Sequence, residues 1–230
     1  MRVLAVDTST RWGAVGLYDD QGPIGEISLL SRESHSSRLL PSIDWMLQTA
    51  GLTLQEIDGF GVTIGPGSFT GLRVGLSTVK GLAWSTKKPV VALHSLEILA
   101  HNLPDVPSFI APMLDARKGR VFGAIYCWEK GVLHTVVSPQ DIEMVQLLDR
   151  DCGTVVCLGD GARKNAATLD ALGTNEIHLA PVETDVPRGG VAARLAHQKL
   201  LAGELLDIVS AEPIYLRASE QELKERGALT

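Results

Sequence analysis

The chain has 230 residues, of which 45% are hydrophobic and 21% charged, and its formal net charge is −6. Such a chain can bury a substantial core as one large domain or two lobes. An acidic surface does not attract phosphate backbones, so these totals disfavour strong direct binding of nucleic acid. They also place the chain among ordinary globular proteins.

The sequence carries no sign of export or of a membrane anchor. It has no apolar run of about 18 residues, and Asp7 interrupts the first apolar stretch too early for a signal peptide. The three cysteines lack the spacing of a zinc site or a disulfide framework. We therefore expect a cytoplasmic protein with reduced thiols and no contact with a membrane.

Apolar runs, turn residues and helical periodicity predict an α/β fold in the first half of the chain. In chain order we expect strands at 3–6, 13–18 and 24–30, a helix at 39–50, a strand at 57–64, a helix at 68–84, a strand at 89–93 and a short helix at 95–102. Pro41 suits the first turn of the first helix, and Gly51 suits the position just after its end.

The second half repeats the opening pattern after a linker that contains two prolines. We expect strands at 109–114, 121–128 and 132–137, a helix at 141–148, a strand at 155–158, helices at 163–172 and 191–201, and an extended segment at 213–217. The acid that follows the first strand is Asp7 in one half and Asp115 in the other, and a glycine turn follows each at similar spacing. This predicts a duplicated architecture.

The predicted domains follow from this repeat. Residues 1–103 form the first lobe and 104–217 the second, with the final segment able to pack back on the first lobe. Residues 218–230 are a polar tail, frayed or disordered.

A glycine-rich turn followed by a long helix is the most distinctive stretch of the sequence. Gly65-Pro66-Gly67 ends a buried strand, and Ser68 or Thr70 can cap the next helix. That helix has an apolar stripe (Leu72, Leu76, Val79, Ala83) beside a stripe of small residues (Gly71, Gly75, Thr78, Gly81). Each internal glycine costs about 0.5–1 kcal/mol relative to alanine, so close approach of another backbone or of a ligand should offset it. The spacing misses the two phosphate-binding fingerprints, and packing is the favoured explanation.

Five segments of the sequence together resemble one protein family. They are residues 3–10, residues 32–36 with 39–41, the turn and helix start at 65–77, residues 115–119, and residues 213–217. The resemblance is to the TsaB (YeaZ) family of bacterial tRNA threonylcarbamoyladenosine biosynthesis, and GPGSFTGLR at 65–73 is its most specific part. It implies a two-lobed fold of the actin, sugar-kinase and Hsp70 class, with a duplicated β-β-β-α-β-α core.

The resemblance also implies partners. Members of the family pair with a catalytic paralogue, TsaD, and an ATPase subunit, TsaE. The complex transfers threonylcarbamoyl from an adenylate to the adenosine beside the anticodon in tRNAs that read codons beginning with A. The chain would therefore contact tRNA only indirectly.

Carried over to this sequence, the interface with TsaD lies on the helices at 37–50 and 68–84. Its residues are Leu39, Leu40, Ile43, Leu47, Ser68, Phe69, Gly71, Leu72, Gly75, Leu76 and Val79. On this hypothesis the small stripe seats the partner helices, so Gly75→Leu or Leu76→Glu abolishes partner binding and leaves the fold largely intact. The same apolar helices, without a partner, would favour a homodimer.

The leading hypothesis is a non-catalytic scaffold without metal or cofactor. TsaD holds a metal with two histidines four residues apart, but Leu39 stands four residues after His35. Asp7 and Asp115 form a possible vestigial cleft: actin-like ATPases aim two such acids at Mg²⁺ and phosphate, but Ser9 stands where those enzymes have glycine. Strand-end aspartates also bond turn N–H groups, which we favour. The alternatives are a free-standing ATPase or phosphotransferase of this fold and a metallopeptidase.

Overall fold

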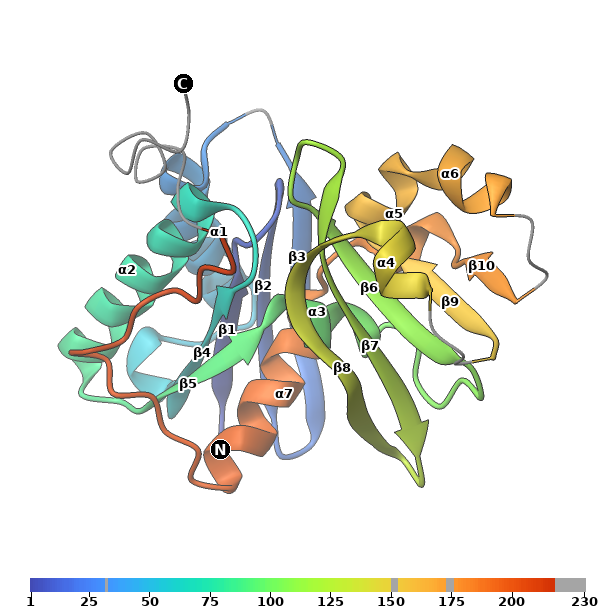
Figure 1. Ribbon diagram of the computed structural model, residues 1–230. Coiled ribbons are helices and arrows are strands. Elements are labelled where there is room, and N and C mark those ends of the chain that lie inside the picture. The colour runs from blue at the N-terminus through green and yellow to red at the C-terminus, as the bar shows by residue number, and fades with distance from the viewer. Residues whose placement is uncertain (32, 150–152, 173–175, 218–230) are drawn as a thin grey trace.

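The computed structural model describes residues 1–31, 33–149, 153–172 and 176–217, and Figure 1 shows them as two α/β lobes side by side. Each lobe is built on one five-stranded sheet, and the strand orders are β3-β2-β1-β4-β5 and β10-β9-β6-β7-β8. In each sheet the first three strands in sequence are antiparallel neighbours, and the last two add in parallel. The second sheet therefore repeats the first, which confirms the predicted duplication.

The strands lie close to their predicted positions. In the first sheet they are β1 (Val3–Asp7), β2 (Trp12–Asp19), β3 (Gly22–Leu30), β4 (Gly59–Gly65) and β5 (Val90–His94). In the second they are β6 (Phe109–Asp115), β7 (Arg120–Glu129), β8 (Val132–Glu143), β9 (Val155–Leu158) and β10 (Ile177–Leu179). The short β10 was not predicted, and β8 takes up the start of the helix expected at 141–148.

The helices cover the faces of the two sheets. They are α1 (His35–Thr49), α2 (Phe69–Thr86), α3 (Ser95–Ala100), α4 (Met144–Leu148), α5 (Asp160–Lys164), α6 (Ala166–Ala171) and α7 (Gly189–Leu201), with 3-10 turns at Leu54–Glu56 and Val182–Asp185. Helix α1 begins four residues before its predicted start, so Pro41 lies inside the helix. Placing Pro41 in the first turn was therefore wrong.

Helices α1 and α2 lie together on one face of the first sheet. Their apolar stripes join β1, β2 and β4 in one core, in which Leu4, Phe60, Val62 and Val79 are fully buried. An amphipathic helix gains most of its stability from such burial, which explains why these two helices follow their periodic pattern closely.

Helix α7 covers the opposite face of the first sheet, although it comes from the end of the chain. It packs against all five strands of that sheet, with Ala192, Ala193 and Ala196 fully buried. At the crossing with β2, a Cβ atom built on Gly16 would lie 1.9 Å from the carbonyl oxygen of Gly189. We expected the helix at 191–201 to complete the second lobe, and this placement corrects that expectation.

The last described segment, residues 206–217, runs back along the first lobe to the second, and we call it the strap. It is held to the first lobe by a hydrogen bond from Leu206 N to Val90 O, by one from Ile214 N to Ile64 O, and by Lys80 Nζ, which donates to Ala211 O. At its end Arg217 Nε donates to Asp141 Oδ2 of β8 at 2.7 Å. The strap therefore links both lobes.

Two predictions concern other properties of the chain. None of the helices in the described part of the chain combines the length and the apolar character that spanning a bilayer requires. The tail predicted at 218–230 lies outside the described residues.

Candidate functional site

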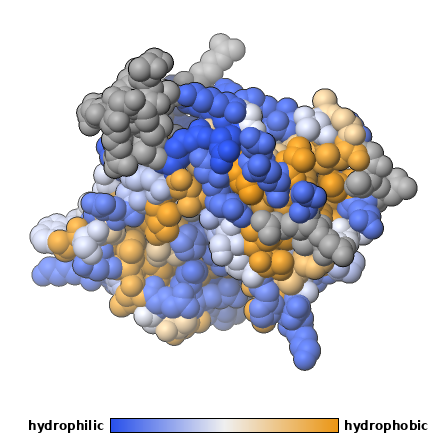
Figure 2. Space-filling model, in the orientation of Figure 1, coloured by the Kyte–Doolittle hydropathy of each residue, from blue (hydrophilic) through white to orange (hydrophobic). Residues whose placement is uncertain are grey.

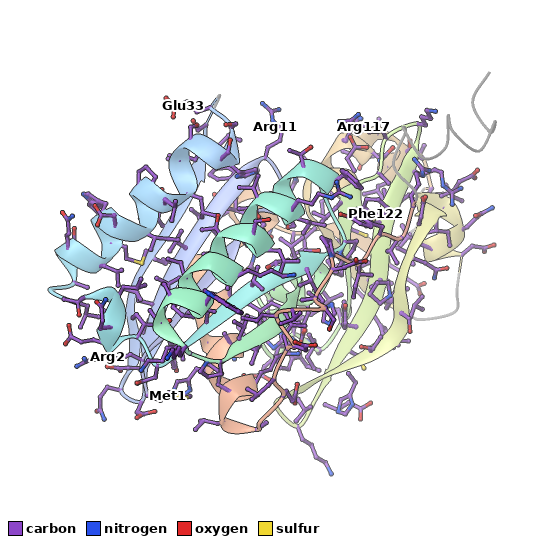
Figure 3. All side chains as sticks on the ribbon, turned by 90° about the vertical axis from the view of Figure 1, so that its left-hand side faces the viewer. Met1, Arg2, Arg11, Glu33, Arg117 and Phe122 are labelled. Carbon is purple, nitrogen blue, oxygen red and sulfur yellow. The ribbon has the colours of Figure 1, made fainter. Side chains whose placement is uncertain are left out.

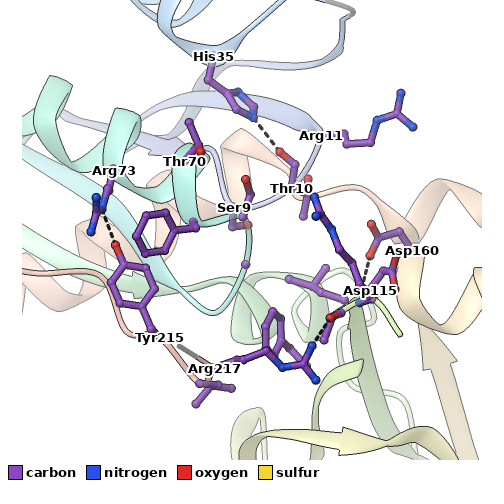
Figure 4. Close-up of a pocket in the computed structure, with 18 of the residues that line it drawn as sticks. Ser9, Thr10, Arg11, His35, Thr70, Arg73, Asp115, Asp160, Tyr215 and Arg217 are labelled. Carbon is purple, nitrogen blue, oxygen red and sulfur yellow. Dashed lines mark hydrogen bonds between the residues drawn. The ribbon is translucent and has the colours of Figure 1, made fainter. Parts of the chain in front are cut away.

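A cavity of about 1260 Å³ lies between the lobes. The first lobe lines it with the loop after β1, the segment from Ser31 into α1, and the start of α2. The second lobe lines it with the loop after β6 and with Asp160, and the strap closes one side (Figure 4). Hydrophilic side chains cover the upper edge of the molecule between the lobes (Figure 2).

The glycine-rich turn forms part of the cavity floor. The Gly65–Pro66 peptide bond is cis and Gly65 has φ +133°, a conformation that favours glycine. Ser68 is the residue that caps α2, because its Oγ accepts from Gly71 N at 3.2 Å. Ser68 N in turn donates to Ser9 O at 2.7 Å, so the turn is fastened to the loop after β1.

The small-residue stripe of α2 has two different environments. Cβ atoms built on Gly71 and Gly75 would lie 2.0 Å from Thr8 O and 2.3 Å from Thr8 Oγ1, and Thr8 Oγ1 donates to Gly71 O at 2.8 Å. These two glycines therefore seat the loop of the chain's own β1, which corrects their assignment to a partner. Gly81, one turn before the end of the helix, meets nothing within 4 Å.

Most of the predicted interface residues lie inside the first lobe. Those buried in the chain itself are Leu39, Ile43, Leu47, Gly71, Leu72, Gly75, Leu76 and Val79. Leu40 and Ser68 are exposed, and Phe69 is half-buried. Because Gly75 and Leu76 are packed against the chain itself, Gly75→Leu or Leu76→Glu would disrupt the fold, contrary to our expectation.

The outward sides of α1 and α2 carry residues that the sequence analysis missed. Trp45 is 60% exposed and Trp84 is 75% exposed. Figure 3 shows the two helices side by side with their outer surface toward the viewer. We call Leu40, Trp45, Gly81 and Trp84 the tryptophan face. The signal was present in the sequence, because both tryptophans fall outside the apolar stripes of their helices.

The two strand-end acids bond the turns that follow them. Asp7 is fully buried, and its Oδ1 accepts from Ser9 N at 2.9 Å and Ser9 Oγ at 2.7 Å. Asp115 Oδ1 accepts from Arg117 N at 2.9 Å, and its Oδ2 pairs with Lys164 Nζ at 2.7 Å. Each carboxylate therefore accepts a hydrogen bond from the backbone N–H two residues further on, which confirms the turn-bonding interpretation.

Burial also shifts the pKa of Asp7. Its desolvation raises the pKa of the Asp7 carboxyl above its ordinary value. The folded state then binds more protons than the unfolded state between the two pKa values, so the free energy of unfolding falls as pH rises through that window.

We expect Asp7→Asn to remove this pH dependence, since an amide Oδ1 can still accept from Ser9 N and does not titrate. As pH rises from about 4, the wild type should lose free energy of unfolding through Asp7 and the variant should not. The stability of the variant relative to wild type should therefore increase with pH. Urea unfolding between pH 4 and pH 7 measures it. A difference that stays constant with pH would contradict the assignment.

His35 and Arg38 fix the loop after β1 from the side of α1. Thr10 O can only accept, so His35 Nε2 donates to it at 2.8 Å, and His35 Nδ1 then accepts from an Arg38 terminal nitrogen at 3.0 Å. Burial lowers the pKa of His35, in keeping with this neutral form. Arg38 also donates to Leu29 O and Arg11 O at 3.0 and 2.8 Å. His35 therefore supports a loop within the chain.

The chain is similar to known proteins over nearly its whole length. A family model described as TsaD, tRNA N6-adenosine threonylcarbamoyltransferase, matches residues 27–156. The tRNA threonylcarbamoyladenosine biosynthesis proteins TsaB of Bacillus subtilis and Escherichia coli are 32% and 31% identical to this chain. These matches cover 97% and 94% of this chain, and 97% and 95% of the two relatives. The chain belongs to the TsaB family.

Solved structures agree with the TsaB assignment. A Pseudomonas aeruginosa protein described as uncharacterised, with similarity to peptidase YeaZ, superposes with a TM-score of 0.81 at 26% identity, covering 94% of this chain and 99% of its own. YeaZ from Pseudomonas aeruginosa gives a TM-score of 0.78 at 24% identity, covering 93% of this chain and all of its own. The resemblance inferred from the five sequence segments is thus confirmed for family and fold.

The word peptidase in that description raises the question of a metal. Among the residues that the structure describes, no group of three or more His, Cys, Asp or Glu side chains is placed to hold a metal ion. In this TsaB-family chain the histidine of α1 is engaged with Thr10 and Arg38, as described above.

Proposed function

We propose that the chain is a non-catalytic subunit that binds and activates a TsaD-type threonylcarbamoyltransferase. Its TsaB relatives are named for tRNA threonylcarbamoyladenosine biosynthesis, and the matching family model is that of the transferase. The reaction served is transfer of threonylcarbamoyl to the adenosine beside the anticodon in tRNAs that read codons beginning with A. The proposed site of action is the cytoplasm.

The tryptophan face is the observation that supports a partner most strongly. Tryptophan is highly buried on average, and at protein interfaces it is frequent among the residues that dominate the binding energy. Gly81 has no neighbour within 4 Å, so nothing among the described residues offsets its cost of about 1 kcal/mol in the helix. A helix of a partner packed closely on α2 would offset it.

The buried state of Asp7 supports the non-catalytic assignment over the alternative, a free-standing ATPase or phosphotransferase. A carboxylate that coordinates Mg²⁺ must present oxygen to the cleft. Asp7 has no exposed surface and does not line the cavity. Its Oδ1 is occupied by Ser9, and its Oδ2, which has no hydrogen-bond partner among the described residues, is buried as well. Calorimetry of the isolated chain with Mg–ATP separates the two functions, because tight binding with turnover would favour the alternative.

The partner surface can be tested by combining Trp45→Glu with Trp84→Glu. We expect affinity for the TsaD-type enzyme of the same organism to fall by at least about thirtyfold, the loss of one interface hot spot. Since both side chains are mostly exposed, the urea unfolding midpoint should not change. Co-purification and a tRNA modification assay, each with and without this chain, provide the measurements.

A matched control introduces the same charge on the other lobe. Val132→Glu combined with Val136→Glu changes two exposed side chains of β8, which are 55% and 45% exposed. This pair should leave co-purification and modification unchanged. Normal complex formation by the tryptophan variant, or an equal loss in the control, would reject the proposed interface.

Two further partners belong to the proposal. An ATPase subunit, TsaE, acts in the same complex. Without TsaD, the tryptophan face is available for a second copy, so we expect an isolated chain to form a homodimer that the double tryptophan variant abolishes. Sedimentation equilibrium of wild type and variant measures this.

A further inference from the structure

The interlobe cavity differs in charge from the rest of the molecule. Its lining has six cationic and three acidic side chains, on a chain with a net charge of −6. The cationic ones are Arg11, Arg38, Arg73, Arg117, Lys118 and Arg217, and the acidic ones are Glu33, Asp115 and Asp160. A cleft lined by one sign of charge focuses its field, so the local potential can oppose the sign of the whole protein.

Ion pairs account for only part of this lining. Asp115 pairs with Lys164, and Arg217 pairs with Asp141. Arg11 on the first lobe and Lys118 on the second form no ion pair with any described residue, and both side chains are exposed. Arg11 extends from the loop beside Thr10 at the rim of the cavity (Figure 4). Cations available to a ligand therefore stand on both lobes.

Arg38 provides a second, independent observation. It lines the cavity, only 8% of it is exposed, and it forms no ion pair with the described residues. Its donors go to two carbonyl oxygens and to His35, and Nε has no hydrogen-bond partner among the described residues. Glu33 attracts Arg38 only from beyond ion-pair distance. A buried guanidinium without a directly paired carboxylate is unfavourable, and an anion in the adjoining cavity would compensate its charge.

The size of the cavity and its floor favour a polymer over a small ligand. Small-molecule sites commonly occupy about 300–1,000 Å³, and this cavity exceeds that range. The turn amides that could cradle a single phosphate are partly taken, because Ser68 N donates to Ser9 O and Gly71 N donates to Ser68 Oγ. The cavity therefore offers mainly side-chain cations, which suit a chain of phosphates.

We propose that the interlobe cleft binds the phosphate backbone of RNA directly. The choice of RNA as the polyanion rests on the proposed function, in which the complex modifies tRNA. The contact goes beyond that function, which reaches tRNA only through the partner. It provides a second point of attachment on the substrate, so this chain would raise the local concentration of tRNA at the partner's active site.

The test measures binding of a fluorescently labelled tRNA transcript to the full chain by anisotropy, at 50 and 200 mM NaCl. We expect Arg11→Glu combined with Lys118→Glu to weaken binding about tenfold or more at the lower salt. The slope of log affinity against log salt should also become shallower by about 0.7–0.9 for each phosphate that the variant no longer neutralises.

The control exchanges two lysines outside the cleft, Lys87→Glu with Lys130→Glu. Both are exposed and, like Lys118, have positive φ, so the charge change is matched and the control includes the same backbone conformation as Lys118. The control should bind tRNA as wild type does. Equal affinity of the cleft and control variants, or no binding by wild type at 50 mM NaCl, would overturn the proposal. Tighter binding of ATP than of tRNA in the cleft would also overturn the proposal.

The effect of the cleft variant on RNA binding can be distinguished from the effect of the tryptophan variant on partner binding. The cleft variant should still co-purify with the TsaD-type enzyme, because Arg11 and Lys118 lie outside the tryptophan face. Loss of RNA binding with normal co-purification supports RNA binding in the cleft, independently of the partner interface. Normal RNA binding by the cleft variant overturns it whether or not the partner binds.

Discussion

Gly71→Ala is expected to destabilise the chain by more than about 3 kcal/mol. The new Cβ atom would lie 2.0 Å from the carbonyl oxygen of Thr8. A backbone atom cannot move aside as a side chain can, so α2 would have to shift away from β1. That shift would also strain the hydrogen bonds from Thr8 Oγ1 to Gly71 O and from Ser68 N to Ser9 O. Urea unfolding of the purified chain measures the loss.

Gly81→Ala in the same helix should have the opposite effect. Its Cβ atom would meet nothing within 4 Å, so the substitution brings only the higher helix propensity of alanine, about 0.5–1 kcal/mol of added stability. Opposite signs for the two substitutions would show that the small stripe has two separate roles. A loss at Gly81 similar to that at Gly71 would contradict this division.

Gly189→Ala should produce a loss of similar size on the other face of the first sheet. Its Cβ atom would lie 2.0 Å from Val15 O, and Gly16 meets Gly189 O just as closely from the opposite side. No side chain fits where the two backbones cross, so α7 would have to move away from β2. We expect a loss of more than about 3 kcal/mol in the free energy of unfolding.

The adjacent glycine gives the control for α7. A Cβ atom on Gly190 would lie 2.6 Å from Glu26 Oε2, the far end of a flexible side chain. Gly190→Ala displaces that carboxylate from Gly190 N and from Arg188, both exposed contacts, so its cost should stay below about 1 kcal/mol. Equal losses at the two positions would mean that steric contact with β2 does not govern the docking of α7.

The positions of most strands and the duplication could be predicted from the sequence because both halves repeat one pattern of apolar runs and turns. The sheet and the face that α7 covers could not be predicted in this way. An apolar stripe tells which face of a helix is buried but not which sheet it meets. The close crossing at Gly16 and Gly189 is a contact between segments that are distant in sequence. The residues next to each glycine do not distinguish it from a glycine in a turn.

The candidate sites were predicted unevenly for similar reasons. The turn-bonding role of Asp7 follows from its position at a strand end, and the structure agrees. The assignment of Gly71 and Gly75 to a partner did not hold, because a close approach within the chain leaves the same sequence pattern as one between chains. The cationic cleft was hidden by the total charge, since Arg11, Arg38 and Lys118 are far apart in sequence.

Because α7 supplies the second covering layer of the first sheet, residues 1–103 do not contain everything that their sheet needs. Val3, Ala5, Val91 and Leu93 would face water until residue 201 is available. During synthesis the first lobe must therefore wait for nearly the whole chain to leave the ribosome. The half that is made first would be the last to become stable, and a fragment that ends at the linker should stay open to proteases.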